Sequence, residues 1–265
     1  MKYFIFSDIH GEYDKLMRSL DAAGFDLANP NHTLVSLGDP FDRGKQSLEM
    51  LKFIMSAPRR IIILGNHDWR LSNLTRGTLY SMDWPISKVD VQNGLDKTLE
   101  SFGCRHNDRI EAELYEWRKA KTEARRLFDA YVREAAVGLE LGDYLMVHGW
   151  VPVHGWVPVR VDGYRVDNAD AWYRASWAST QIYVQSDRYF PHLKTLVIGH
   201  WWAYDLRRIM EPNKYKGRRD DSIYYCSIRP FIAIDGCTNS HGGKANVLVI
   251  ETDQTPNPIK IKLPA

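Results

Sequence analysis

Cysteine is scarce in this sequence, and long apolar runs are missing. The three cysteines, Cys104, Cys226 and Cys237, have no CxxC spacing, so we expect free thiols in a reducing compartment rather than disulfides or a zinc site. No window approaches the roughly 20 apolar residues of a membrane span, and the first apolar run is too short for a secretory signal. These absences predict a cytoplasmic protein without a membrane partner.

An excess of charge of one sign is missing as well. Lys and Arg number 35 against 33 Asp and Glu, which gives a net charge of +2. This balance excludes binding through a general surplus of basic charge, so stable nucleic-acid binding is not expected. The hydrophobic share of 44% and the charged share of 26% are those of an ordinary globular protein. The composition does not indicate an oligomeric state.

Apolar runs and helical patterns alternate along the chain. Strands are expected at residues 3–6, 32–37, 60–64, 145–147, 195–198, 231–234 and 245–250. Helices are expected between the first three of them, at residues 12–23 and 46–55. The alternation predicts an α/β fold with central β-sheets flanked by helices. The last two strands, separated by a polar turn, predict a second, partly antiparallel sheet.

A segment without strand candidates lies at about 93–136. Residues 111–134 are rich in Glu, Lys, Arg and Ala, with apolar residues at helical spacing. We expect a helical insertion that packs beside the sheet or caps its edge. The whole chain, 1–265, is then expected to be a single domain that carries this insertion.

Five polar clusters stand at the ends of five predicted strands. They are Asp8-Ile9-His10-Gly11, Gly38 to Gly44, Gly65 to Asp68, His148-Gly149, and Gly199-His200. The carboxyl ends of strands in an α/β sheet are where ligand sites form. Each cluster alone could be a turn, but five in register with five strands predict one site. Carboxylate, imidazole and amide ligands without cysteine favour two divalent metal ions, Mn²⁺ first, with Fe, Zn or Ni as alternatives.

Taken in order, DxH, GDxxDRG, GNHD, HG and GH resemble the calcineurin-like metallophosphoesterase family. GDxxDRG places the chain near that family's phosphoprotein-phosphatase branch. The resemblance runs from Asp8 to about Ser240, and the helical insertion is its least matched part. It implies a four-layer α+β fold and a metal-dependent phosphoesterase that forms no covalent intermediate.

The resemblance also implies a role for each matched residue. The implied metal ligands are Asp8, His10, Asp39, Asn66, His148 and His200. The implied catalytic residues are His67, Asp42 and Arg43, and the implied phosphate-binding residues are Arg43, Asn66 and Arg174. In this assignment Asp39 bridges the two ions, and His67, oriented by Asp42, protonates the leaving group.

The histidine of the fourth motif occurs twice, because HGWVPV at 148–153 repeats at 154–159. His148 directly follows an apolar strand, whereas His154 follows Pro152, which cannot lie in a central strand. We therefore assign the metal ligand to His148 and expect His154 in a loop at the rim of the site.

The substrate class is less sharply indicated than the chemistry. Ser7, Asp68 and Trp201 stand where phosphoprotein phosphatases usually have Gly, Glu and Thr. The main hypothesis is a phosphomonoesterase of the Ser/Thr protein phosphatase type, with a phosphoprotein substrate. The alternative is a nucleotide phosphohydrolase acting on dinucleoside polyphosphates, cyclic nucleotides or polynucleotide ends. Asp42, usually replaced in symmetrical dinucleoside tetraphosphatases, counts against the first of these. A remote third hypothesis, an inactive binding module, is disfavoured by the intact motifs.

Two further segments leave alternatives open. Six basic residues between Arg207 and Arg219 predict a solvated loop, with steering of an acidic substrate as the alternative. The aromatic residues from Trp172 to Tyr189 predict core and groove wall, with a base-stacking platform as the alternative.

Overall fold

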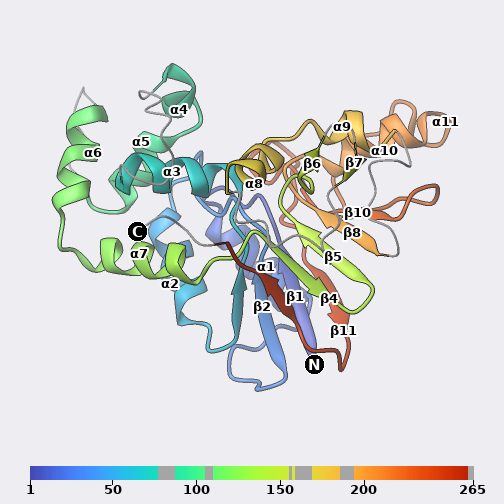
Figure 1. Ribbon diagram of the computed structural model, residues 1–265, viewed down its shortest axis with the longest axis horizontal. Coiled ribbons are helices and arrows are strands. Elements are labelled where there is room, and N and C mark those ends of the chain that lie inside the picture. Colours follow the sequence, from blue (N-terminus) through green and yellow to red (C-terminus); the bar gives the residue numbers. More distant parts are fainter. Residues whose placement is uncertain (77–86, 105–109, 155–156, 159–168, 186–193, 262–265) are drawn as a thin grey trace.

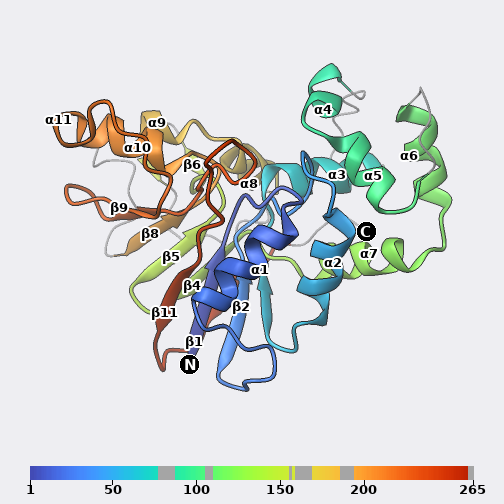
Figure 2. The same cartoon turned by 180° about the vertical axis from the view of Figure 1, so that it is seen from behind.

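Two β-sheets form the centre of the molecule, and helices lie around them (Figures 1 and 2). The computed structural model describes residues 1–76, 87–104, 110–154, 157–158, 169–185 and 194–261. Within these residues the α/β class with helix-flanked sheets, expected from the sequence, is confirmed.

The first sheet has the strand order β11-β1-β2-β3. Its strands are β1 (Lys2–Phe6), β2 (His32–Ser36), β3 (Arg60–Ile62) and β11 (Leu248–Glu251). The three N-terminal strands run parallel, and β11 is antiparallel to β1. Because β1, β2 and β3 are parallel, the polar turns that follow them meet at one edge of the sheet.

The second sheet has the order β12-β4-β5-β8-β10-β9. Its strands are β4 (Gly138–Leu141), β5 (Tyr144–Val147), β8 (Thr195–Ile198), β9 (Tyr224–Tyr225), β10 (Phe231–Ala233) and β12 (Asn257–Ile259). The middle strands β5, β8 and β10 are parallel, and the pairs at the edges are antiparallel. Part of the repeated HGWVPV segment forms a small antiparallel hairpin of β6 (Val153–His154) and β7 (Val157–Pro158).

The pairing predicted for the last two strands is wrong. The strand predicted at 231–234 is β10, in the second sheet, whereas the strand predicted at 245–250 is β11, beside β1 in the first sheet. Strand β11 alternates buried and exposed residues, which is the pattern of a strand with one face in the core and the other exposed. The second sheet is nevertheless partly antiparallel, as expected.

The core follows the alternation of side chains along the strands. In β1, Tyr3 and Ile5 pack with residues of the second sheet such as Met146 and Val197, between the two sheets. Phe4 and Phe6 belong to the larger cluster that includes residues of the surrounding helices. Both faces of β1 are therefore buried, which explains its uninterrupted apolar sequence.

The helices surround this double sheet. They are α1 (Tyr13–Ala22), α2 (Ser47–Ser56), α3 (Asn66–Arg76), α4 (Lys88–Gln92), α5 (Leu95–Ser101), α6 (Ile110–Lys119), α7 (Glu123–Glu134), α8 (Ala169–Ser176), α9 (Thr180–Tyr183), α10 (Ala203–Met210) and α11 (Pro212–Tyr215). Figure 2 shows α1 and α2 lying along the first sheet. None of the helices in the described residues is long and apolar enough to cross a membrane.

The insertion expected at about 93–136 is helical wherever it is described. Helices α5, α6 and α7 make it up, so the long helical pattern at 111–134 is two helices rather than one. The break falls before Thr122, whose side chain accepts a hydrogen bond from the Arg125 N–H and begins α7. Bidentate hydrogen bonds of 2.8 Å from Arg60 on β3 to Glu134 fix the end of α7 to the first sheet.

Candidate active site

The predicted ligands sit in tight turns at the carboxyl edge of the two sheets. Among the described residues, seven other than glycine have positive φ, and six of them belong to the strand-end motifs: Asp8, His10, Asp39, Asp42, Arg43 and His200. Such left-handed backbone is unfavourable for residues with a side chain, and it concentrates at functional sites. The turns also bind one another, since Asp8 N donates to Gly38 O and His10 N to Asp39 O, both at 3.1 Å.

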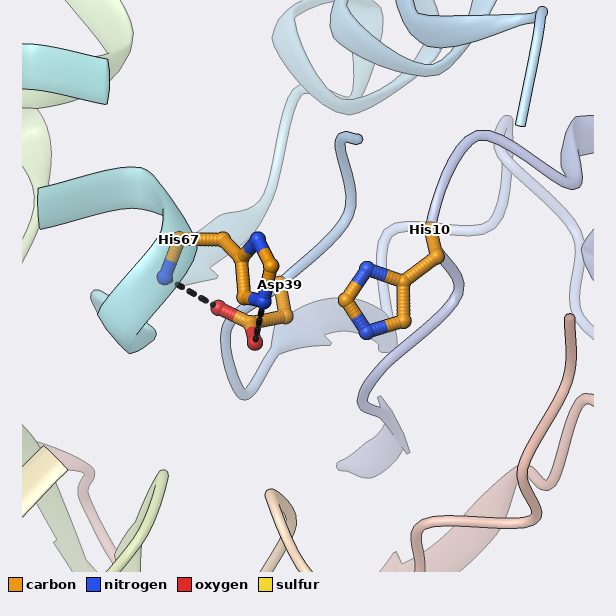
Figure 3. A group of neighbouring side chains, drawn as sticks. All are labelled: His10, Asp39 and His67. Atoms are coloured by element: carbon orange, nitrogen blue, oxygen red, sulfur yellow. Dashed lines mark hydrogen bonds and ion pairs between the residues drawn. The ribbon is translucent and has the colours of Figure 1, made fainter. Parts of the chain in front are cut away.

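Asp39 lies at the centre of the site, between two groups of side chains. The first group is His10, Asp39 and His67, whose ligand atoms lie within 4.8 Å of one another (Figure 3). Asp39 Oδ1 accepts the His67 N–H at 2.9 Å, and Asp39 Oδ2 lies 3.9 Å from His67 Nε2. Asp8 Oδ1 is 4.0 Å from His10 Nε2, which places Asp8 beside this group.

The second group is Asp39, His148 and His200, and it comes from both sheets. His148 Nε2 lies 2.9 Å from Asn66 Oδ1 and 3.3 Å from Asp39 Oδ2. The His200 N–H donates to Asp8 Oδ2 at 2.9 Å, which joins the end of β8 to the end of β1. The six predicted metal ligands are therefore brought together around Asp39.

The histidine rings are oriented by backbone carbonyls. His10 Nδ1 lies 2.9 Å from Phe41 O, and His148 Nδ1 lies 2.9 Å from Leu37 O. When Nδ1–H donates to the carbonyl, Nε2 is left as a lone pair that points into the site. Second partners of this kind accompany metal-binding histidines and fix their tautomer.

The electrostatics of the site call for positive charge between the acids. Burial alone would lower the pKa of His148, but the charges of Asp39 and Asp8 outweigh it and raise the pKa to about 10. Burial alone would raise the pKa of Asp39, but the positive charges of His148 and His67 hold it well below its usual range. Burial together with the charge of His148 lowers the pKa of His200 to about 3.

These observations fit a pair of divalent cations. The lone pair of His148 Nε2 faces two acceptor oxygens, on Asn66 and Asp39, so either a proton or a metal cation must lie among them. The donors are imidazole nitrogens and carboxylate or amide oxygens, a set that suits Mn, Fe, Zn or Ni. Asp39 is shared by both groups, and its Oδ2 lies 3.9 Å from His67 Nε2 and 3.3 Å from His148 Nε2.

His67, Asp42 and Arg43 form a second arrangement within the site. His67 Nδ1 is 2.7 Å from Asp42 Oδ2, and Arg43 Nη2 is 3.5 Å from His67 Nε2. Burial alone would lower the pKa of His67, but the charges of Asp39 and Asp42 outweigh it and raise the pKa. The His67–Asp42 contact predicted from the sequence is therefore present, and Nε2 faces the space beside Asp39.

The helical insertion, expected beside the sheet or over its edge, contacts this arrangement through residues that the sequence did not single out. Thr98 on α5 donates its hydroxyl to Asp42 Oδ1 at 2.8 Å and accepts the Asp42 N–H at 2.9 Å. Phe41, whose carbonyl orients His10, packs its ring against the rings of Phe102 and Tyr131 at 5.7 and 5.3 Å between centroids. The insertion therefore packs beside the site and supports the turn that carries Asp39 to Arg43.

Asp68 and Ser7 support the ligands through buried hydrogen bonds. Asp68 is buried, and its Oδ2 accepts the N–H groups of Asp39 and Gly65 at 3.1 and 2.8 Å. Ser7 Oγ lies 2.5 Å from Asp8 Oδ2. In the sequence both residues stand out only as departures from a family pattern, although a polar residue beside a ligand is a signal for such support.

Arg174 is not drawn into the ligand cluster by any interaction of the described residues. It lies on α8, its side chain is 70% exposed, and it forms an ion pair with Asp170 at 2.7 Å. It lines a separate cavity of about 340 Å³. Its role in phosphate binding stays a prediction. The side chain of His154 lies outside the described residues, so its place at the rim stays a prediction too.

The basic segment at 207–219 is structured where the sequence predicted a solvated loop. Arg207 is buried, and its guanidinium donates to the carbonyls of Asp220, Ser222 and Ile223. The Arg207 guanidinium therefore binds backbone carbonyls in the interior of the protein and does not face solvent. In the aromatic segment, Trp172 is buried as expected, whereas Trp177 is 42% exposed.

Comparisons with known proteins define the family. The family model for calcineurin-like phosphoesterases matches residues 1–201 of the 265, so the chain belongs to this family. The matched part contains all five strand-end motifs. The resemblance that the motifs carried is therefore confirmed.

Individual relatives match over shorter stretches. The asymmetrical bis(5'-nucleosyl)-tetraphosphatase PrpE of Bacillus velezensis is 30% identical over 163 residues, which are 57% of this chain and 57% of the relative. The symmetrical bis(5'-nucleosyl)-tetraphosphatase of Buchnera aphidicola is 40% identical over 97 residues, 36% of this chain and 32% of the relative. The matches thus span about half the length of these relatives or less.

Solved structures confirm the fold across nearly the whole chain. One, provisionally described as a diadenosine tetraphosphatase, aligns with a TM-score of 0.55 at 16% identity and covers 97% of this chain and 93% of its own. A cold-active protein-tyrosine phosphatase of a Shewanella species aligns with a TM-score of 0.51 at 16% identity, covering 98% and 80%. At this identity the likeness concerns the fold alone.

Proposed function

We propose that this phosphoesterase hydrolyses nucleoside polyphosphates, with dinucleoside polyphosphates as the leading candidates. The observation that carries the proposal is the pair of His–Asp groups that share Asp39, a donor set for two divalent cations. The names of its relatives support nucleotide substrates better than the phosphoprotein substrate first expected. Asp42 is present and hydrogen-bonded to His67. Because this residue is usually replaced in the symmetrical dinucleoside tetraphosphatases, its presence counts against an enzyme of that type.

The ligand sets follow from the geometry. The first ion would be held by Asp8, His10 and Asp39, and the second by Asp39, Asn66, His148 and His200. When bound, the two ions, Mn²⁺ in our proposal, would lower the pKa of the attacking water and polarise the phosphoryl oxygens. Asp39, the residue common to both groups, would be a ligand of both ions.

Arg43 and Asn66 would hold the phosphate. The Arg43 guanidinium lies beside His67 and can donate two parallel N–H groups to phosphoryl oxygens, a geometry that Lys cannot reproduce. Its backbone is fixed because the Arg43 N–H donates to Asn93 O at 2.9 Å in the insertion. Arg174 is kept as a further candidate for phosphate binding.

His67 would act as the general acid. Its Nδ1 stays on Asp42, so Nε2 is the atom that gives a proton to the leaving oxygen as the bond between phosphorus and that oxygen breaks. The water oxygen remains on the phosphoryl product. The Asp42 carboxylate compensates the positive charge of the imidazolium before the proton is transferred, and Thr98 holds Asp42 in position.

A substrate panel tests the proposal. The purified protein with added Mn²⁺ is assayed on a bis(5'-adenosyl) tetraphosphate, a cyclic nucleotide and a phosphoserine peptide, with Asp39→Asn as the control for contaminating enzymes. We expect the highest kcat/KM for the dinucleoside polyphosphate and no activity in the presence of EDTA. A phosphopeptide kcat/KM that exceeds that of every nucleotide would return the chain to the protein-phosphatase hypothesis.

A further inference from the structure

An exposed tryptophan lies against the histidine that we assign as the acid. The rings of Trp177 and His67 are nearly parallel, at 23°, with their centroids 6.5 Å apart. Trp177 is 42% exposed, so part of its ring system is open to a ligand. It directly follows α8, and its N–H donates to Arg174 O at 3.2 Å.

A row of aromatic rings holds Trp177 in place. Tyr173, one turn earlier on α8, meets the Trp177 ring edge to face at 6.2 Å between centroids. Tyr173 in turn packs on Trp69 of α3 at 5.5 Å, and Trp69 is buried. The indole is thus supported from the core and exposed at its outer end, so little conformational freedom remains to be lost when a ligand contacts it.

Because Trp177 lies beside His67, it is placed near the leaving group of the substrate. The leaving oxygen must come within hydrogen-bond reach of His67 Nε2 to receive its proton. Whatever is attached to that oxygen therefore extends from His67 toward the neighbouring surface. Among the described residues, Trp177 is the exposed aromatic side chain whose ring is paired with that of His67. A planar, uncharged ring carried by the leaving group can stack there, whereas a phosphate chain cannot.

We propose that Trp177 is a stacking platform for the nucleobase of the leaving nucleotide. The inference rests on the proposed function, because it assigns the leaving group of a nucleoside polyphosphate. It makes Trp177 a specificity-determining residue, distinct from the residues that bind the ions or the reacting phosphate. It also revises the interpretation of the aromatic segment, in which a stacking role was only the alternative.

The test compares substrates with and without a base. Trp177→Ala and Trp177→Phe are assayed on ATP and on inorganic tripolyphosphate, which share the phosphoanhydride bond. For Trp177→Ala we expect KM for ATP to rise about tenfold and tripolyphosphate kinetics to stay within about twofold, with most of the loss restored in Trp177→Phe. Trp202→Ala is the matched control, since Trp202 is 41% exposed and stands two residues after His200, with no ring contact to His67 among the described residues. An equal loss on both substrates, or a loss selective for ATP in the control alone, overturns the inference.

A binding measurement separates this inference from the proposed function. Calorimetry compares the affinity of the wild type and of Trp177→Ala for β,γ-methylene ATP, with methylene bisphosphonate as the ligand without a base. A wild type that fails to turn over nucleotides but binds the analogue about tenfold more tightly than Trp177→Ala contradicts the function and supports the platform. Equal affinities of the two proteins for the analogue, including no measurable binding by either, overturn the platform whatever the substrate panel gives.

Discussion

Asp68 is predicted to hold two turns of the site together, and its replacement tests the physical account of the site. A single oxygen, Asp68 Oδ2, accepts the N–H groups of Asp39 and Gly65 at 3.1 and 2.8 Å, and the side chain is 0% exposed. Asp68→Ala leaves both donors buried without this acceptor. A buried polar group that loses its partner costs about 1–3 kcal/mol, so two such donors predict a loss of roughly 2–6 kcal/mol in the free energy of unfolding.

Urea unfolding with a chelator present measures this loss without a contribution from bound metal. Asp26→Ala is the matched control, because Asp26 also accepts a backbone N–H, from Ala28 at 2.9 Å, but on the exposed surface. Water replaces that acceptor, so the control should lose less than about 1 kcal/mol. Asp68→Asn keeps one oxygen in place and should lie between the two.

Comparing the variants shows whether Asp68 stabilises the turns through its hydrogen bonds or through its charge. Asp68→Ala should also bind less Mn²⁺ than the wild type, because the backbone of Asp39 is no longer fixed. If Asp68→Ala unfolds at the same urea concentration as Asp26→Ala, the two hydrogen bonds do not stabilise the turns and the reasoning is refuted. If Asp68→Asn loses as much as Asp68→Ala, the carboxylate acts through its charge instead.

Three further changes probe the remaining assignments. His67→Ala should lower turnover of alkyl phosphates about 10²–10⁴-fold and that of p-nitrophenyl phosphate less, with near-normal metal content, because a good leaving group needs no acid; equal losses would contradict the acid role. His148→Ala should lose bound metal measured by mass spectrometry, whereas His154→Ala should keep it, and the reverse result would reassign the ligand. Thr98→Val should lower turnover about tenfold at unchanged metal content, since it removes a hydrogen bond that orients the acid's carboxylate; unchanged turnover would show that α5 does not act on the site.

The ligand cluster could be predicted because its signal is local. Each motif directly follows an apolar strand, and the carboxyl ends of parallel strands lie at one edge of a sheet, so sequence position alone brings Asp8, Asp39 and Asn66 together. His148 and His200 join them because β5 and β8 are parallel neighbours in the second sheet. The helical pattern of the insertion was likewise a local signal, readable from the spacing of its apolar residues.

The supporting contacts could not be predicted because they join distant segments. Thr98 and Asp42 are separated by 56 positions, and nothing in the sequence of α5 distinguishes Thr98 from an ordinary buried threonine. Trp177 and His67 are brought together only when α8 packs on α3. Arg207 looked like one cation of a solvated stretch, since its burial depends on carbonyls that follow it by more than ten residues.

The backbone of the site explains why the ligands remain where they are despite local strain. Six residues of the strand-end motifs hold left-handed φ angles between 51° and 69°. At about 1 kcal/mol each, the strain is roughly 6 kcal/mol, comparable to the whole net stability of a small domain. Glycine would relieve most of it at each position but would remove a donor atom with its side chain. Folding alone therefore does not account for these residues, whereas a site that must hold cations between facing acids does.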